Sequence, residues 1–157
     1  MSSTKNSKII KASPETIFSA FTNPEALGIW LTPGDMTGKV HSFDLKAGGG
    51  YEMSLYYPQS EKESRGKTSK NEDRFSAKFV EITPFNKIVQ TINFDSDNPA
   101  FSGEMIMEVT FEAVGNGTKV TFVFKNIPPG IRPEDNEAGT ESTLEKLARY
   151  VEKDSIS

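Results

Sequence analysis

The stretch PPGIRPEDNEAGTESTLEKLARYVEKD, residues 128–154, contains the strongest helical pattern in the chain. Its apolar residues recur at i, i+3, i+4 and i+7, and they are Leu144, Leu147, Ala148 and Val151. Pro133 suits the first position of a helix, and the acidic residues that follow it suit the positive end of the helix dipole. Towards the N-terminus the same stripe reaches Thr140 and Glu137 and becomes polar. The pattern therefore predicts a long C-terminal helix. Its second half packs against the core, and its first half closes one end of a cavity.

Composition limits the class of protein. At 157 residues, with 35% apolar and 25% charged residues, the chain is expected to be a single globular domain over residues 1–157. The net charge of −4 argues against a nucleic-acid-binding surface. Cysteine is absent, and no apolar run has the length of a signal peptide or a membrane span. We therefore expect a cytoplasmic protein without disulfides, membrane contact or nucleic-acid partner.

The rest of the chain predicts a short strand, two short helices and six further strands. The first strand is expected at residues 8–11, and Ser13-Pro14 and Asn23-Pro24 each have the composition of a helix start. Trp30 ends the second helix, and a turn follows at residues 33–35. Alternation of apolar and polar residues then predicts strands at residues 39–45, 51–57, 74–82, 87–94, 105–112 and 118–125.

The connections between these strands have the length of hairpins, which indicates an antiparallel sheet. They are expected at residues 46–50, where three glycines permit positive φ, at the polar segment 58–72, at 95–103 and at 115–117. Strands grouped apart from helices indicate an α+β fold. Only the C-terminal helix is long enough to cover the buried face of such a sheet.

Short motifs that belong together are spread over nearly the whole chain. In chain order they are Ala12-Ser13-Pro14-Glu15 with Phe18, Ala20 and Phe21; Asn23-Pro24-Glu25-Ala26-Leu27 with Trp30; Phe43-Asp44-Leu45 with Gly48-Gly49-Gly50-Tyr51; Phe79-Val80-Glu81-Ile82 with Pro84; and Leu144-Glu145-Lys146-Leu147. This series resembles the START-like (SRPBCC) superfamily, and within it the homologues of the activator of the heat-shock-protein-90 ATPase. The resemblance implies a helix-grip fold, in which a curved antiparallel sheet of about seven strands wraps around the C-terminal helix. That branch commonly has an aromatic residue after the glycine that opens this helix, whereas Gly139 is followed here by Thr140, which implies a different cavity mouth.

For function the resemblance implies three alternatives. Members of the superfamily bind lipids, sterols, polyketides, plant hormones or flavonoid-like molecules between sheet and helix, a few are cyclases or aromatases, and the branch takes its name from a domain of a cochaperone. The first hypothesis is therefore binding, without catalysis or cofactor, of a small hydrophobic or aromatic molecule by a monomer or homodimer. The second is a cyclase or aromatase that acts on a polyketide-like substrate and uses Glu137, His41 or Tyr51 as acid or base. The third is a protein-interaction module that contacts a chaperone.

A binding cavity would be lined by inward residues of the strands and by the polar start of the last helix. Aromatic and methionine side chains at period two most often fill a core, so only the resemblance makes them cavity candidates. Trp30 is open to two interpretations, either at the cavity mouth or as an anchor of the two short helices. The candidates are Trp30, Tyr51, Met53, Phe79, Met105, Met107, Phe122, Phe124, Glu137, Thr140 and Leu144.

Other chemical sites are disfavoured by spacing. His41 is the only histidine, and no serine, cysteine or second histidine is placed by sequence to complete a triad or a metal site, so a structural role is favoured. Asp95-Ser96-Asp97 superficially suggests a calcium loop, but its sixth and twelfth positions hold Ala100 and Ile106 instead of glycine and glutamate. We expect no metal. A buried Glu137 would need a partner, for which Arg132, Arg74 and Tyr51 are the candidates.

Overall fold

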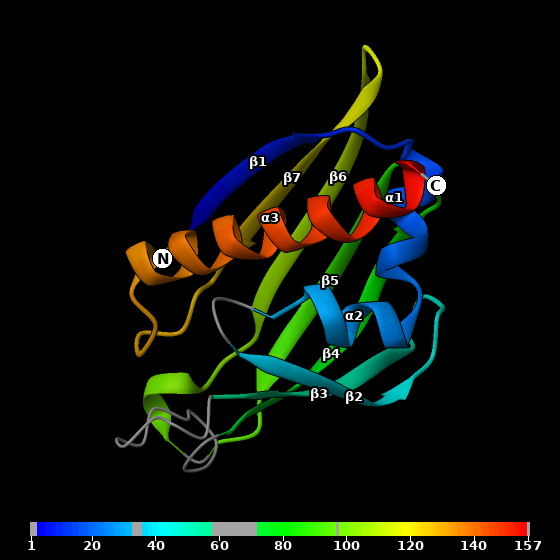
Figure 1. Ribbon diagram of the computed structural model, residues 1–157. Coiled ribbons are helices and arrows are strands. Elements are labelled where there is room, and N and C mark those ends of the chain that lie inside the picture. Colours follow the sequence, from blue (N-terminus) through cyan, green and yellow to red (C-terminus); the bar gives the residue numbers. More distant parts are fainter. Residues whose placement is uncertain (1–2, 33–35, 58–71, 97, 157) are drawn as a thin grey trace.

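Seven antiparallel strands form one curved sheet, and the long C-terminal helix lies across its concave face (Figure 1). The computed structural model describes residues 3–32, 36–57, 72–96 and 98–156, without the side chains of 153–156. The sheet has the order β1-β7-β6-β5-β4-β3-β2. The elements are β1 (Thr4–Ile10), α1 (Pro14–Phe21), α2 (Pro24–Trp30), β2 (Thr37–Phe43), β3 (Gly50–Tyr56), β4 (Glu72–Thr83), β5 (Lys87–Phe94), a 3₁₀ turn (Pro99–Phe101), β6 (Met105–Val114), β7 (Gly117–Lys125) and α3 (Pro133–Ile156). This is the predicted helix-grip architecture.

The two short helices begin where the sequence predicts. The Ser13 side chain accepts a hydrogen bond from the backbone N–H of Thr16 at 3.2 Å and caps α1. Asn23 Oδ1 accepts from the N–H of Glu25 at 2.9 Å and caps α2 in the same way. In both cases a side-chain oxygen satisfies an N–H that has no partner within the helix.

The second half of α3 packs on the core as predicted. Leu144, Leu147, Ala148 and Val151 are all buried. Trp30 is fully buried between the short helices, where its Nε1–H donates to the carbonyl of Ala20 at 2.9 Å and its ring lies 4.6 Å from that of Phe21. Of the two interpretations of Trp30, the structure therefore supports the anchor. No helix among the described residues combines the length and the apolar character needed to cross a membrane.

The turn before β3 corrects one expectation from sequence. Of its three glycines only Gly48 has a positive φ, at 89°. A Cβ at Gly50 would lie 1.9 Å from the carbonyl oxygen of Ala77 on β4, and one at Gly49 would lie 2.5 Å from that of Asp44. Two of the three glycines are therefore required by the close approach of neighbouring backbone, rather than by positive φ.

Several boundaries also differ from those predicted. β2 covers Thr37–Phe43 instead of residues 39–45, because the hairpin loop after it takes up residues 44–49. β4 begins at Glu72, which the sequence predicts as the end of the preceding polar segment, because Glu72 pairs with Tyr56 of β3. The predicted turn at 33–35 and most of the predicted loop at 58–72 lie outside the described residues. The expected loop at 95–103 contains the 3₁₀ turn.

Candidate functional site

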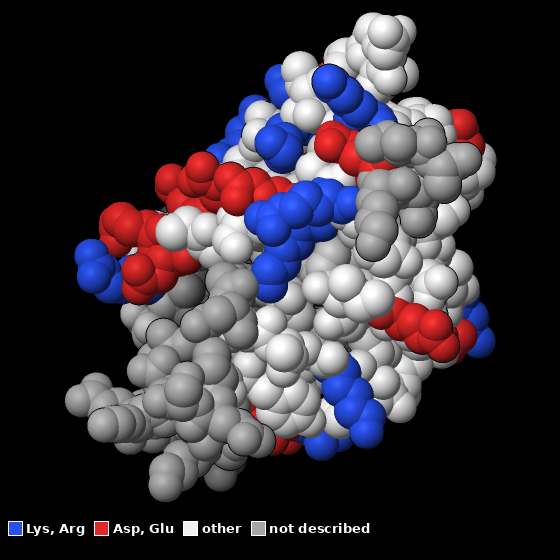
Figure 2. Space-filling model, viewed as in Figure 1, with Lys and Arg blue, Asp and Glu red and all other residues white. Residues whose placement is uncertain are grey.

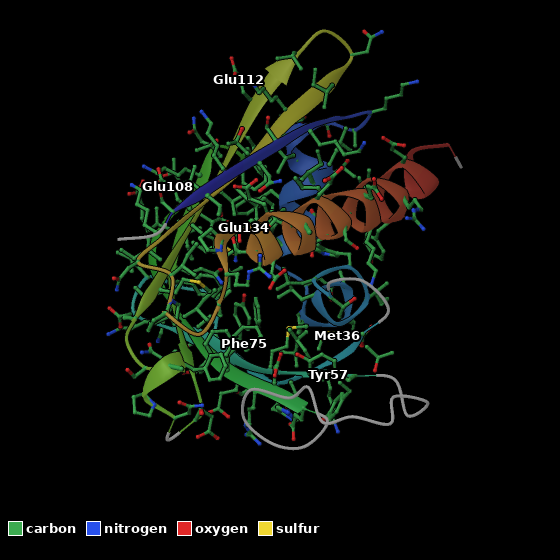
Figure 3. The ribbon with its side chains drawn as sticks, turned by 90° about the vertical axis from the view of Figure 1, so that its left-hand side faces the viewer. Met36, Tyr57, Phe75, Glu108, Glu112 and Glu134 are labelled. Atoms are coloured by element: carbon green, nitrogen blue, oxygen red, sulfur yellow. The ribbon has the colours of Figure 1, made fainter. Side chains whose placement is uncertain are left out.

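A cavity of about 400 Å³ lies between the concave face of the sheet and the first half of α3. Strands β3 to β7 supply one side of it, α3 supplies the other, and the segments at Leu31, Met36, Phe101 and Gly130–Arg132 border its ends. The side chains of Phe75 and Met36 line this space, below the helix α3 at whose start Glu134 is located (Figure 3). The cavity therefore occupies the position where the sequence predicts that the helix turns polar.

The small side chains of α3 explain why the interior is hollow at this end. The helix face that looks into the cavity carries Asn136, Gly139, Thr140 and Thr143. Leucine follows only at Leu144, where the closed core begins. Short side chains on the helix cannot fill the distance that the leucines fill further along. The change from small to large residues along one helix therefore divides the concave face into a cavity and a core.

The walls of the cavity are mainly apolar. Neighbouring aromatic rings give them a fixed shape, since Phe94 lies 6.3 Å from Phe75 and 6.4 Å from Phe101 in edge-to-face arrangements. The apolar lining residues are Leu31, Met36, Leu55, Phe75, Ile92, Phe94, Phe101, Met105, Met107, Phe124 and Ile131.

Three buried polar residues, Tyr51, Gln90 and Asp73, interrupt these walls on the sheet side, and Asp73 is hydrogen-bonded to the half-buried Tyr57 outside the cavity lining. Gln90 Nε2 donates to the hydroxyl oxygen of Tyr51 at 2.7 Å, and the hydroxyl of Tyr57 donates to Asp73 Oδ2 at 2.8 Å. Asp73, Gln90 and Tyr51 are each at most 4% exposed. Burial raises the pKa of Tyr51 to about 12, against a smaller lowering by the hydrogen bond from Gln90. Tyr51 is therefore a neutral phenol at physiological pH.

On the helix side, two threonines bring hydroxyls to the cavity. Thr140 donates to the backbone carbonyl of Asn136 at 2.7 Å, which satisfies its proton within the helix. Thr143 is buried as a residue and lines the cavity, and no hydrogen-bond partner for its hydroxyl occurs in the described part of the chain. Thr143 therefore presents a free hydroxyl to whatever occupies the cavity.

The opening of the cavity lies near the start of α3. Arg132 and Asp135 line it and are exposed, and Arg132 Nε lies 3.4 Å from Glu134 Oε2. Figure 2 shows acidic side chains gathered over the first half of this helix. The loop before α3 is held to the 3₁₀ turn, since the N–H of Gly130 donates to the carbonyl of Ala100 at 2.6 Å. The opening is thus polar, while the interior is apolar.

Ten of the eleven cavity candidates from sequence fall into two groups in the structure. Tyr51, Met105, Met107, Phe124 and Thr140 line the cavity. Trp30, Met53, Phe79, Phe122 and Leu144 are buried in the closed part of the core instead.

Glu137 belongs to neither group, because it is exposed and does not line the cavity. The residue of α3 that lines the cavity one turn before Thr140 is Asn136. Asn136 is four residues before Thr140 and faces the sheet, whereas Glu137 is three residues before it and turns away from the sheet. None of the three partners considered for a buried Glu137 is needed.

His41 has a partner that sequence alone did not reveal. Its Nε2 lies 2.8 Å from Ser54 Oγ, and Ser54 in turn donates to Glu72 Oε2. In a nucleophilic triad the imidazole stands between serine and carboxylate, whereas here the serine stands between the other two. Ser54 alternates with Met53 and Leu55 along β3 and therefore points away from the cavity. The chain His41–Ser54–Glu72 joins three neighbouring strands on the opposite face of the sheet.

The three acid–base candidates considered for a cyclase thus do not meet in one place. Tyr51 lines the cavity, His41 lies across the sheet from it, and Glu137 faces solvent.

Sequence reasoning missed several polar residues of the cavity, among them Gln90, Thr143 and Asp73. Gln90 stands between Ile88 and Ile92 on the inward face of its strand, and a polar residue on an apolar face was a readable signal. Thr143 is a comparable signal, because it is a polar residue directly before the leucines of α3. Asp73 gave no such signal, because it falls between the segment interpreted as a polar loop and the predicted start of β4.

Comparison with known proteins gives a family and a set of similar structures. The family model described as Activator of Hsp90 ATPase homolog 1-like protein matches residues 11–152. A crystal structure of a protein from Chromobacterium violaceum is 29% identical, with a TM-score of 0.84 and 96% of each chain covered. The comparison with curated proteins gave no match.

Two more distant structures show the fold alone. A protein from Nitrosomonas europaea is 19% identical, with a TM-score of 0.73, and the match covers 97% of this chain and 95% of that one. The AHSA1-like protein of Aeromonas hydrophila is 16% identical, also with a TM-score of 0.73, and the match covers 99% of this chain and 96% of that one.

Proposed function

The chain belongs to the Activator of Hsp90 ATPase homolog 1-like family, and we propose that it binds one small hydrophobic or aromatic molecule in the cavity beneath the first half of α3. The single observation that carries this proposal is the cavity itself, at about 400 Å³ and lined by eleven apolar residues. Small-molecule sites in proteins have volumes of about 300–1,000 Å³ and mostly apolar walls with a few polar groups. START-like folds often bind hydrophobic ligands in this position, which agrees with the proposal.

The chemistry of the lining supports an amphipathic ligand of lipid-, polyketide- or flavonoid-like character. Each square ångström of apolar surface that leaves water contributes about 25 cal/mol, so the rings and methionines of the walls supply the driving force. The hydroxyls of Tyr51 and Thr143 and the amide of Gln90 then favour one orientation of the ligand. Met105 and Met107 are flexible enough to adapt to ligands of different outline.

The proposal includes no catalytic step and no cofactor, because the acid–base candidates lie on different faces of the fold. It places the binding in the cytoplasm, in a single-domain protein that acts as a monomer or homodimer without nucleic acid or membrane.

The five methionines of the chain offer a local test. Met36, Met105 and Met107 line the cavity, whereas Met53 is fully buried in the closed core. We expect N-phenyl-1-naphthylamine, a neutral aromatic dye, to bind with 1:1 stoichiometry and enhanced fluorescence. In protein labelled with ¹³C at the methionine methyl groups, the dye should shift the signals of Met36, Met105 and Met107 and leave that of Met53 in place.

Shifts spread evenly over Met53 and the cavity methionines, or fluorescence that rises without saturation, would show adsorption to the surface and contradict the proposal. The absence of both binding and methyl shifts, with this dye and with long-chain alcohols, would also overturn it.

A further inference from the structure

Tyr51 is held rigidly at the inner wall of the cavity. Its ring lies 5.8 Å from that of Phe43 in a stacked arrangement, 5.7 Å from Phe79 and 6.2 Å from Phe75. Ala77 is its register partner on β4, and this small side chain leaves room for the ring to lean across β4 towards Gln90 on β5. The position of the phenol is therefore fixed before any ligand enters.

The Tyr51 hydroxyl keeps an unused hydrogen-bond donor. Its oxygen accepts from Gln90 Nε2, and no acceptor for its own proton is found among the described residues. If the Gln90 amide is turned over, Tyr51 donates to Gln90 and the amide N–H groups become the unused donors, so either orientation leaves a donor at this point. Because the pKa of Tyr51 is about 12, the hydroxyl keeps its proton throughout the physiological range.

The charges around the cavity disfavour an anion as its acceptor. Among the described residues that line the cavity, Arg132 is the only cation, and it is exposed at the opening beside Glu134. An anionic group that reached Tyr51 would lie buried without a counter-charge, which is costly. A neutral oxygen matches the neutral phenol.

We infer that the ligand carries a neutral oxygen acceptor, such as a ketone, quinone or lactone carbonyl, which accepts a hydrogen bond from Tyr51 at the inner wall while Gln90 holds the phenol in place. This inference rests on the proposed function and adds to it the chemical class of the ligand. Tyr51 thereby becomes a specificity residue for ring systems that bear a carbonyl, over hydrocarbons of the same shape.

A matched pair of probes tests the inference. Fluorene and 9-fluorenone have the same tricyclic outline and differ in the carbonyl, and both are measured by displacement of N-phenyl-1-naphthylamine. A neutral hydrogen bond in a buried site predicts that fluorenone binds about three- to tenfold more tightly than fluorene. In Tyr51→Phe that preference should fall to about onefold, because fluorenone weakens and fluorene does not.

Tyr56→Phe is the matched control, since Tyr56 is on the same strand and does not line the cavity. It should keep the full preference for fluorenone. A second readout does not depend on affinity: the carbonyl stretch of bound fluorenone should move to lower frequency in the wild-type protein and in Tyr56→Phe, and return to its apolar-solvent value in Tyr51→Phe.

The outcomes separate this inference from the proposed function. If both probes displace the dye with equal affinity, or if the preference for fluorenone survives in Tyr51→Phe, the inference is wrong and the cavity-binding proposal stands. If neither probe displaces the dye and the methionine methyl signals do not move, the binding proposal falls and the inference falls with it.

Discussion

At the scale of single residues, the buried phenol of Tyr51 links stability to pH. Its pKa is about 12 in the folded protein and about 10 in an unfolded chain, so the folded state holds the proton more firmly. A raised pKa means that its contribution to stability is complete below pH 10 and is lost as the pH rises towards 12. The free energy of unfolding should therefore fall by about 1.4 kcal/mol more in the wild type than in Tyr51→Phe between pH 8 and pH 11.

Urea unfolding of the two proteins at pH 8, 9, 10 and 11 measures this difference. Lysines and the other tyrosines titrate in both proteins, so their effects cancel in the comparison. A difference between wild type and Tyr51→Phe that stays constant across this range would contradict the burial of the phenol.

The residues of the cavity were predictable to different degrees. Tyr51, Met105 and Met107 follow from alternation, because period two places them on the buried face. Alternation does not tell a residue that fills a core from one that borders a cavity. For that reason the sequence predicts Met53 and Phe122 as cavity candidates, whereas both pack in the core outside the cavity lining. Whether a buried side chain meets empty space depends on the side chains across from it, and these come from distant parts of the chain.

At the scale of elements, the hairpin turn before β3 depends on a glycine that alternation cannot explain. A Cβ at Gly50 would overlap the carbonyl of Ala77, which is backbone in the centre of the sheet and cannot move aside. Gly48 has a positive φ, but a Cβ there would meet nothing within 4 Å. We expect Gly50→Ala to lower the free energy of unfolding by at least about 2 kcal/mol and Gly48→Ala to lower it by about 1 kcal/mol.

Thermal and urea unfolding of the two variants give this ranking. Gly48→Ala is an informative control for Gly50→Ala, because both changes add the same methyl group to the same turn. A Gly48→Ala variant that is less stable than Gly50→Ala would show that positive φ, as expected from the sequence, governs this turn after all.

The two halves of α3 should respond differently to substitution. Leu147 is fully buried in the core, so Leu147→Ala should cost about 3 kcal/mol through lost packing and the cavity it creates. Thr143 borders a space that exists already, and its hydroxyl has no partner among the described residues. Replacing it with the similarly shaped valine should therefore leave stability unchanged or raise it by up to about 1 kcal/mol.

Denaturation of Leu147→Ala and Thr143→Val, each compared with wild type, checks both values. A large loss of stability in Thr143→Val would mean that the first half of α3 is packed as tightly as the second. The sequence predicts this division of the helix from its stripe, but it assigned Glu137 to the inner face, because a stripe of period 3.6 does not distinguish positions i−3 and i−4 at a polar end.

At the scale of the whole molecule, the architecture was predictable from the sequence. The cavity was not, because its volume depends on small differences in how side chains fill the space between helix and sheet. Hairpin-length connections require an antiparallel sheet, and one long amphipathic helix was the only element that could cover it. A volume of about 400 Å³ is the small remainder when the side chains of α3 and five strands are fitted between helix and sheet. No local sequence pattern predicts this volume. The sequence therefore indicates where a ligand would bind, and only the structure gives the size of the cavity.

Filling the cavity from the helix separates the cavity-binding proposal from one in which the protein works through its surface. Thr143→Phe places an aromatic ring in the apolar cavity, where it should stabilise the ligand-free protein by adding apolar contacts. The same ring occupies the ligand space, so the affinity for N-phenyl-1-naphthylamine should fall at least about tenfold, a difference of about 1.4 kcal/mol.

Glu137→Phe is the control, because it adds the same side chain to the exposed face of the same helix. Dye binding by this variant should match that of the wild type, whatever the change does to solubility. If Thr143→Phe binds the dye as well as the wild type does, and Glu137→Phe alters that binding, the dye lies on the surface of α3. The cavity would then have no part in binding, and the protein-interaction alternative would be the better account of the fold.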